Sequence, residues 1–154
     1  MTDVLELITK CLSDEGLEPQ VDEAQRSWVV KFNFDGQPRH AILLHPPEDD
    51  YVIAASLISS PAVLKDRRVG TLPAGVLATL IAVSSNEGML AKLTYFESGP
   101  SYYATSACSI DGPTGAKLRR RLEACARLAA AIEKELADLP QKKNGAKKRT
   151  PKKR

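Results

Sequence analysis

Residues 117–140 read KLRRRLEACARLAAAIEKELADLP, and this stretch carries the strongest pattern in the chain. Its apolar positions alternate steps of four and three residues: Leu118, Leu122, Cys125, Ala129, Ile132, Leu136 and Leu139. The spacing predicts one long amphipathic helix that lies on a sheet or against a partner helix. Burial of the four large aliphatic side chains before Leu139 contributes roughly 1.5–3 kcal/mol each. The helix therefore belongs to the fold, and Pro140 ends it.

Strands and two further helices precede this segment. Residues 28–34 alternate with a period of two, which is typical of a strand with one face in water. Asp35 and Gly36 indicate a tight turn after it. The predicted elements are helix 3–15, strands 28–34, 39–45 and 51–58, helix 73–86, and strands 90–96 and 102–110. Strand 51–58 is almost continuously apolar, so we expect it at the centre of the sheet.

These elements predict an α+β fold. Three strands joined by short turns form an antiparallel meander, and a second hairpin completes a five-stranded antiparallel sheet. Together with the three helices, the expected order is α-β-β-β-α-β-β-α. Thr2 is expected to cap the first helix, and Gly16 is expected in a left-handed cap at its end.

The second predicted helix lies within residues 69–86, an 18-residue run without charge. This run offers more apolar surface than one helix face normally needs. We therefore expect a surface for a partner or for a second copy of the chain, formed by Val76, Leu77, Leu80 and Ile81. The oligomer expected from this surface is a homodimer.

Charge divides the chain into two parts. The net charge is +3, but residues 141–154 hold eight Lys or Arg and no acid, which leaves residues 1–140 at −5. We expect a folded domain over 1–140 and a disordered basic tail over 141–154, because the tail has too little apolar surface to offset its ordering entropy.

The tail is a candidate polyanion-binding segment without sequence preference, with nucleic acid, the ribosome and anionic membrane all admissible. Its cationic candidates are Lys142, Lys143, Lys147, Lys148, Arg149, Lys152, Lys153 and Arg154. A role in solubility alone is the competing interpretation. If all eight bind duplex nucleic acid, log affinity should fall with log salt at a slope no steeper than about −7.

Arg119, Arg120 and Arg121 form a second cationic group, near the start of the last helix. Three cations there oppose the helix dipole, at a few tenths of a kcal/mol each. Two interpretations stay open: a solvated face that pairs with Glu123 and its neighbours, or a patch for an anion or an acidic partner.

The residues of common catalytic sites are absent or badly spaced. His40 and His45 lie five apart on one predicted strand, so they point to opposite faces and cannot share a metal. Residues 112–117 lack the glycine before lysine and the hydroxyl after it that a phosphate loop needs. The acids at 48–50 lack the ligand spacing of a calcium loop. We expect no enzyme, no metal and no cofactor.

Cysteines and hydropathy indicate the compartment. The three cysteines form neither a disulfide framework nor a zinc pattern, which fits a reducing cytoplasm. The N-terminus carries acids that a secretory signal would lack. The longest uncharged run has too short an apolar stretch to span a bilayer. We therefore expect a cytoplasmic protein.

The element order resembles the type III secretion chaperone-like fold and, within it, the YbjN-like family of small bacterial proteins. The resemblance covers about residues 3–139 and rests on this order, on the uncharged second helix ending in Asn86 before the hairpin, and on the closing amphipathic helix. It implies a single α+β domain, often a homodimer. Chaperones of this fold bind extended segments of a client protein, and YbjN-like members are linked to regulation.

The functional expectation combines these points. We expect a non-enzymatic protein-binding, chaperone-like or regulatory protein that presents its sheet and second helix to a polypeptide partner. The alternative is a protein that associates with nucleic acid non-specifically through its basic tail.

Overall fold

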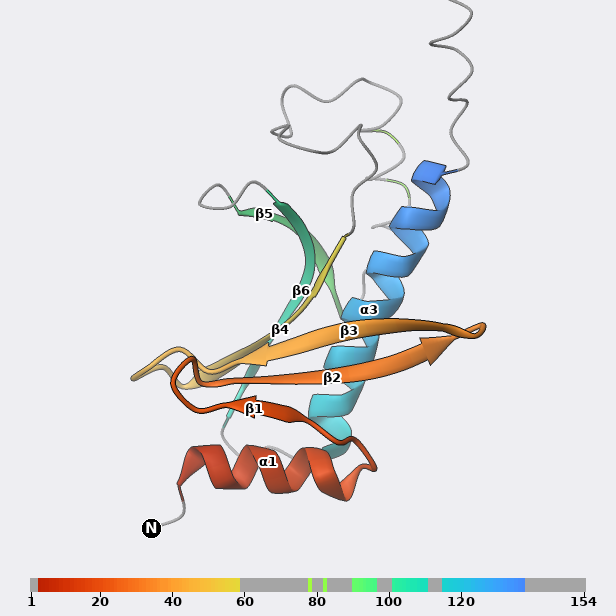
Figure 1. Ribbon diagram of the computed structural model, residues 1–154. Coiled ribbons are helices and arrows are strands. Elements are labelled where there is room, and N and C mark those ends of the chain that lie inside the picture. Colours follow the sequence, from red (N-terminus) through yellow and green to blue (C-terminus); the bar gives the residue numbers. More distant parts are fainter. Residues whose placement is uncertain are drawn as a thin grey trace, which may run out of the picture.

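The computed structural model describes residues 3–58, 78, 82, 90–96, 101–110 and 115–137 (Figure 1). Its two named helices are α1 (Val4–Asp14) and α3 (Gly115–Ala137). Its strands are β1 (Gln20–Asp22), β2 (Ser27–Phe34), β3 (Gln37–Leu44), β4 (Tyr51–Leu57), β5 (Lys92–Phe96) and β6 (Ser101–Ser109). The α+β class and the antiparallel sheet predicted from the sequence are confirmed.

The sheet has the order β1-β2-β3-β4-β6-β5, and each neighbouring pair is antiparallel. Strand β4 lies between β3 and β6, so its predicted central place is confirmed. The described sheet has six strands, and the prediction of five was wrong because it omitted β1. All three residues of β1 are exposed, so no apolar alternation indicated a strand. Backbone pairing with β2 holds it, with Val21 opposite Trp28.

The described residues contain two helices of defined extent, against three expected. The predicted middle helix, 73–86, lies outside them except for Ala78 and Ala82, which are helical and exposed. Helix α1 is capped by Asp3 rather than by Thr2, because the Asp3 carboxylate accepts a hydrogen bond from the Leu5 N–H at 3.2 Å. Gly16 follows its end with φ of 81°, as predicted for a left-handed cap.

The β2–β3 hairpin turns at the predicted dipeptide. Asp35 and Gly36 have φ angles of 53° and 80°. Positive φ at both central residues is the geometry that matches the twist of a two-residue hairpin. Strand β3 ends at Leu44, so His45 lies just beyond it rather than on it as predicted.

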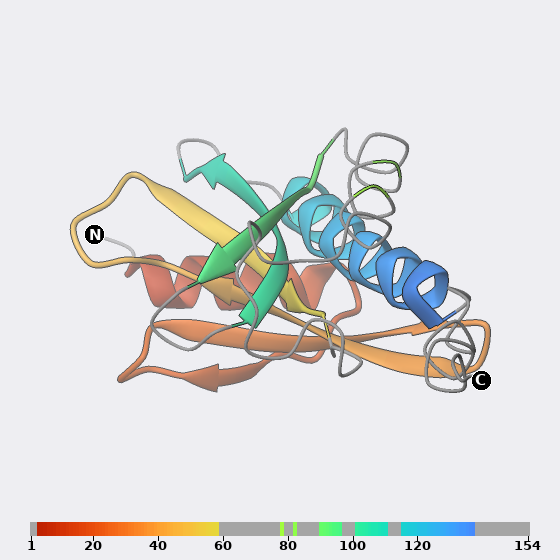
Figure 2. The ribbon, with the colours of Figure 1, turned by 90° about the horizontal axis from the view of Figure 1, so that it is seen from above.

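The hydrophobic core lies between α3 and one face of the sheet (Figure 2). Six of the seven predicted stripe positions of α3 are at most 1% exposed: Leu118, Leu122, Cys125, Ala129, Ile132 and Leu136. The seventh, Leu139, lies outside the described residues. Trp28 is fully buried, and its indole N–H donates to the Thr9 hydroxyl of α1 at 2.9 Å. Both helices therefore pack on the face of the sheet that carries Trp28.

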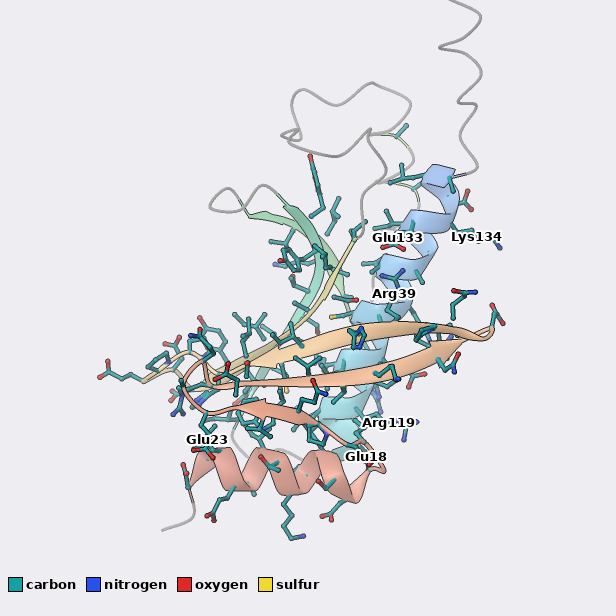
Figure 3. The ribbon with its side chains drawn as sticks, in the orientation of Figure 1. Glu18, Glu23, Arg39, Arg119, Glu133 and Lys134 are labelled. Carbon is teal, nitrogen blue, oxygen red and sulfur yellow. The ribbon has the colours of Figure 1, made fainter. Side chains whose placement is uncertain are left out.

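Contacts at both ends of α3 position it. At its start, a Cβ at Gly115 would collide with the backbone carbonyl of Cys11, so glycine permits the close approach of α3 to α1. Toward its end, the Arg39 guanidinium of β3 binds the Glu133 carboxylate in a bidentate pair, one bond of which measures 3.0 Å (Figure 3). The pair fixes the β2–β3 hairpin against α3.

Candidate functional site

One face of the sheet carries no described helix. Helix α3 runs behind β2 and β3 in Figure 1, and the alternate side chains of these strands point the opposite way. We call this surface the open face and define it by six apolar residues: Val29, Ile42, Leu44, Tyr51, Ile53 and Leu57. Pairing brings Val29 beside Ile42 and Leu44 beside Ile53, so the apolar side chains are contiguous across three strands.

Two residues of β4 make the open face accessible. Tyr51 is 40% exposed and Leu57 is 46% exposed, while the other four side chains are half-buried. Leu57 lines a hollow of about 210 Å³ with Pro38, Arg39 and His40. An exposed apolar patch beside a hollow suits the apolar side chains of a polypeptide partner. Sequence reasoning placed this strand centrally but did not separate its buried side from its open side.

A second hollow separates α1 from the edge strand β1. Its volume is about 510 Å³, and seven residues line it: Asp3, Leu5, Glu6, Thr9, Lys10, Val21 and Glu23. We call it the acidic groove. Strand β1 is at the end of the described sheet, so one of its edges has no neighbouring strand there. Sequence reasoning missed this groove because it missed β1.

The three consecutive arginines separate in the structure. Arg119 donates to the Glu15 carbonyl at the end of α1 at 2.9 Å, where a cation suits the helix dipole. Arg121 donates to the Ser106 hydroxyl at 3.0 Å. Arg120 is exposed and lines a hollow with Glu123 and Leu90. Arg119 and Arg121 thus bind groups of the fold itself, and binding of a polyanion by the three stays a prediction.

The remaining predicted site residues lie outside the described part of the chain. The candidate partner or dimer surface comprises Val76, Leu77, Leu80 and Ile81. The eight cationic candidates of the tail belong to residues 141–154. Their roles stay predictions.

The two histidines, His40 and His45, lie in different surroundings. His40 is exposed on β3, whereas His45 is 5% exposed. The Arg26 guanidinium donates to Nδ1 of His45, and Nε2 of His45 lies 3.2 Å from the Asp49 carbonyl. Because a guanidinium only donates, Nδ1 of His45 accepts this hydrogen bond, which leaves Nε2 to donate to the Asp49 carbonyl. The ring joins the β1–β2 turn to the β3–β4 loop. The described residues contain no group of three or more His, Cys, Asp or Glu placed to hold a metal.

The three cysteines are free thiols of unequal accessibility. Cys108 and Cys125 are buried, and Cys11 is half-buried. Burial raises the pKa of the Cys125 thiol to about 12, and its Sγ lies 3.4 Å from the Ala54 carbonyl. A thiol held in its protonated form is a poor nucleophile.

Alkylation of the native protein near pH 8 should therefore label Cys11 fastest and leave Cys125 unmodified until the chain unfolds. Peptide mass spectrometry after timed exposure to iodoacetamide measures this order. Rapid labelling of Cys125 in the native state would contradict the packing of α3 on β4.

Among the described residues, we find no helix that combines the length and apolar character needed to cross a bilayer.

No protein-family model matches the chain, and no curated protein sequence does. Solved structures do match it in fold.

One match is to a chain of the HopA1–SchA chaperone–effector complex, with 14% identity, a TM-score of 0.54, and coverage of 87% of this chain and 99% of the other. A chain of the ExsC–ExsE complex matches with 14% identity, a TM-score of 0.57, and coverage of 86% and 96%. A chain of the heterodimeric ExoU–SpcU complex, from the type III secretion system of Pseudomonas aeruginosa, matches with 13% identity, a TM-score of 0.55, and coverage of 82% and 95%. The chain therefore has a type III secretion chaperone-like fold.

Proposed function

We propose that this chain is a non-enzymatic, chaperone-like protein that binds a polypeptide client through the open face and the predicted helix 73–86. The open face carries the proposal: Tyr51 and Leu57 are exposed apolar side chains on a sheet surface that no described helix covers. The shared fold supports it, because one of the matching structures is a chaperone bound to its effector.

The chemistry of the open face favours a polypeptide over a small substrate. Its hollow at Leu57 has a volume of only about 210 Å³, and the six apolar side chains of the open face are spread along three strands. Large apolar side chains of an extended segment can cover such a surface. Each Å² of apolar surface that this removes from water contributes roughly 25 cal/mol of hydrophobic free energy. The one strongly shifted thiol, Cys125, is buried and protonated, so it supplies no nucleophile.

Finer assignments belong to the same proposal. We propose membership of the YbjN-like family of bacterial proteins, a cytoplasmic location and a regulatory role. We also propose a homodimer formed through the uncharged run that contains Val76, Leu77, Leu80 and Ile81. The clients would be extended polypeptide segments.

Affinity capture from the native host tests the polypeptide partner against the nucleic-acid alternative. The bait is the full chain, compared with a chain ending at Pro140, each with and without nuclease treatment. We expect the same stoichiometric protein on both baits, unaffected by nuclease, because neither the open face nor helix 73–86 includes the tail. A partner lost on removal of 141–154, or released by nuclease, would overturn the proposal in favour of nucleic acid.

A further inference from the structure

The net charge of the chain is concentrated in two short segments. Residues 3–26, which form α1, β1 and the turn after β1, hold seven acidic and two basic residues. Residues 27–140 hold twelve of each sign, so they are neutral overall. The tail, 141–154, holds eight basic residues and no acid. The negative net charge of residues 1–140 therefore comes from residues 3–26, which include α1 and the edge strand β1.

Acidic and apolar side chains lie together in the acidic groove. Leu5 and Val21 line it, and Val21 is 40% exposed. Lys10, its one basic lining residue, binds Asp14 outside the groove at 2.8 Å, and this pairing raises the pKa of Lys10. Within the described part of the chain, the Glu6 and Glu23 carboxylates bind no cation. Figure 3 shows Glu23 beside α1 at one end of β1 and Glu18 near the other end.

The groove also offers backbone groups. Strand β1 is an edge strand, and no described strand pairs with its outer side. An extended segment can therefore donate and accept backbone hydrogen bonds there while its side chains meet Val21 and the carboxylates. Such a segment should carry Lys or Arg and no acid. Residues 141–154 of the chain itself have this composition, with eight basic residues and no acid.

The tail can reach the groove within one molecule. Helix α3 begins against Cys11 of α1 and has 23 residues, so its other end lies about 34 Å away. The chain beyond Ala137 spans up to about 58 Å when extended. Six of the eight cations lie in the last eight residues, 147–154. Lys147 can lie at most about 34 Å from Ala137 and Arg154 about 58 Å, so the end of this segment has the most chain with which to reach α1 and the groove.

We propose that residues 147–154 of this chain dock in the acidic groove of the same molecule. Charge complementarity provides the attraction, and the short tether raises the local concentration of the tail above that of a free peptide. The docked tail occupies the open edge of β1, which protects the sheet from pairing with other strands. The inference goes beyond the proposed function and does not depend on a client.

Amide spectra of the full chain test this docking. The comparison variant replaces Lys147, Lys148, Arg149, Lys152, Lys153 and Arg154 with Gln. In about 0.05 M NaCl, we expect chemical-shift differences at amides of Asp3–Glu23 and none on α3 or β4. At about 0.5 M NaCl, where the Debye length is about 4 Å, these differences should disappear.

Two further variants of the full chain locate the binding site. The first is the double variant Glu6→Gln/Glu23→Gln. At low salt, the amide chemical shifts of its residues 147–154 should match those that the unaltered chain shows at high salt. The matched control, Asp35→Asn/Glu135→Gln, removes two exposed acids outside the groove and should leave the tail amides unchanged. Identical spectra of α1 and β1 with and without tail charge would overturn the proposal. The proposal would also be overturned if both double variants changed the amide chemical shifts of residues 147–154 equally. That result would show that the tail is attracted to the acidic residues of the domain in general and not to the groove.

Discussion

A chain that ends at Ala131 should lose most or all of its stability. It lacks Ile132 and Leu136, which are each 0% exposed, and the Glu133 carboxylate that binds Arg39. Loss of a buried Leu or Ile side chain costs about 2–5 kcal/mol, so the two cost about 4–10 kcal/mol. The total stability of a small domain is about 5–15 kcal/mol. Urea unfolding followed by circular dichroism should show a flattened or absent transition.

A chain that ends at Pro140 provides the matched control. It lacks the predicted basic tail but retains the described part of α3, so its urea midpoint should stay close to that of the full chain. If tail removal also unfolds the domain, the assignment of the boundary near Pro140 is wrong. A chain ending at Ala131 with an unchanged midpoint would show that the end of α3 contributes little to the core.

Replacement of Trp28 by Ala should lower the free energy of unfolding by about 3–5 kcal/mol. The Trp28 side chain is 0% exposed and is the largest in the core. It joins β2 to α1 through its hydrogen bond to Thr9. Its loss leaves a cavity between two elements that other contacts hold in place, so the site cannot fully collapse. Equilibrium urea unfolding, followed by circular dichroism, measures the change.

Thr9→Val separates the hydrogen bond from the packing. This variant keeps the shape of the side chain but removes the acceptor of the Trp28 N–H, and a buried donor left without an acceptor should cost about 1–3 kcal/mol. A loss from Thr9→Val as large as that from Trp28→Ala would mean that the hydrogen bond, rather than burial of the indole, joins α1 to the sheet.

Periodicity predicted the parts of the fold that are buried on one side. The stripe from Leu118 to Leu136 and the alternation from Trp28 to Phe34 both appear in the structure where expected. The Asp35-Gly36 turn was also predictable, because few residues accept a positive φ at two consecutive positions. In each case a local requirement, burial of one face or a positive φ angle, restricts which residue types can occupy the position.

Features without such a trace were missed. Strand β1 is exposed at every position, so only its backbone pairing with β2 makes it a strand. The acidic groove depends on β1 and on the position of α1, which are set by tertiary contacts such as Gly115 against Cys11. The exposure of Tyr51 and Leu57 depends on which face α3 covers, and an almost uniformly apolar strand does not encode that choice.

Binding of the captured client to variants of the open face tests the central claim most directly. The variants are Leu57→Glu, at a side chain 46% exposed on the open face, and Leu7→Glu, at a side chain 36% exposed on α1. Isothermal titration should show at least tenfold weaker client binding for Leu57→Glu, because a carboxylate must be desolvated at the interface. Leu7→Glu should bind like the unaltered chain, and both variants should keep its urea midpoint. Unchanged affinity of Leu57→Glu, or an equal loss in both variants, would contradict client binding at the open face.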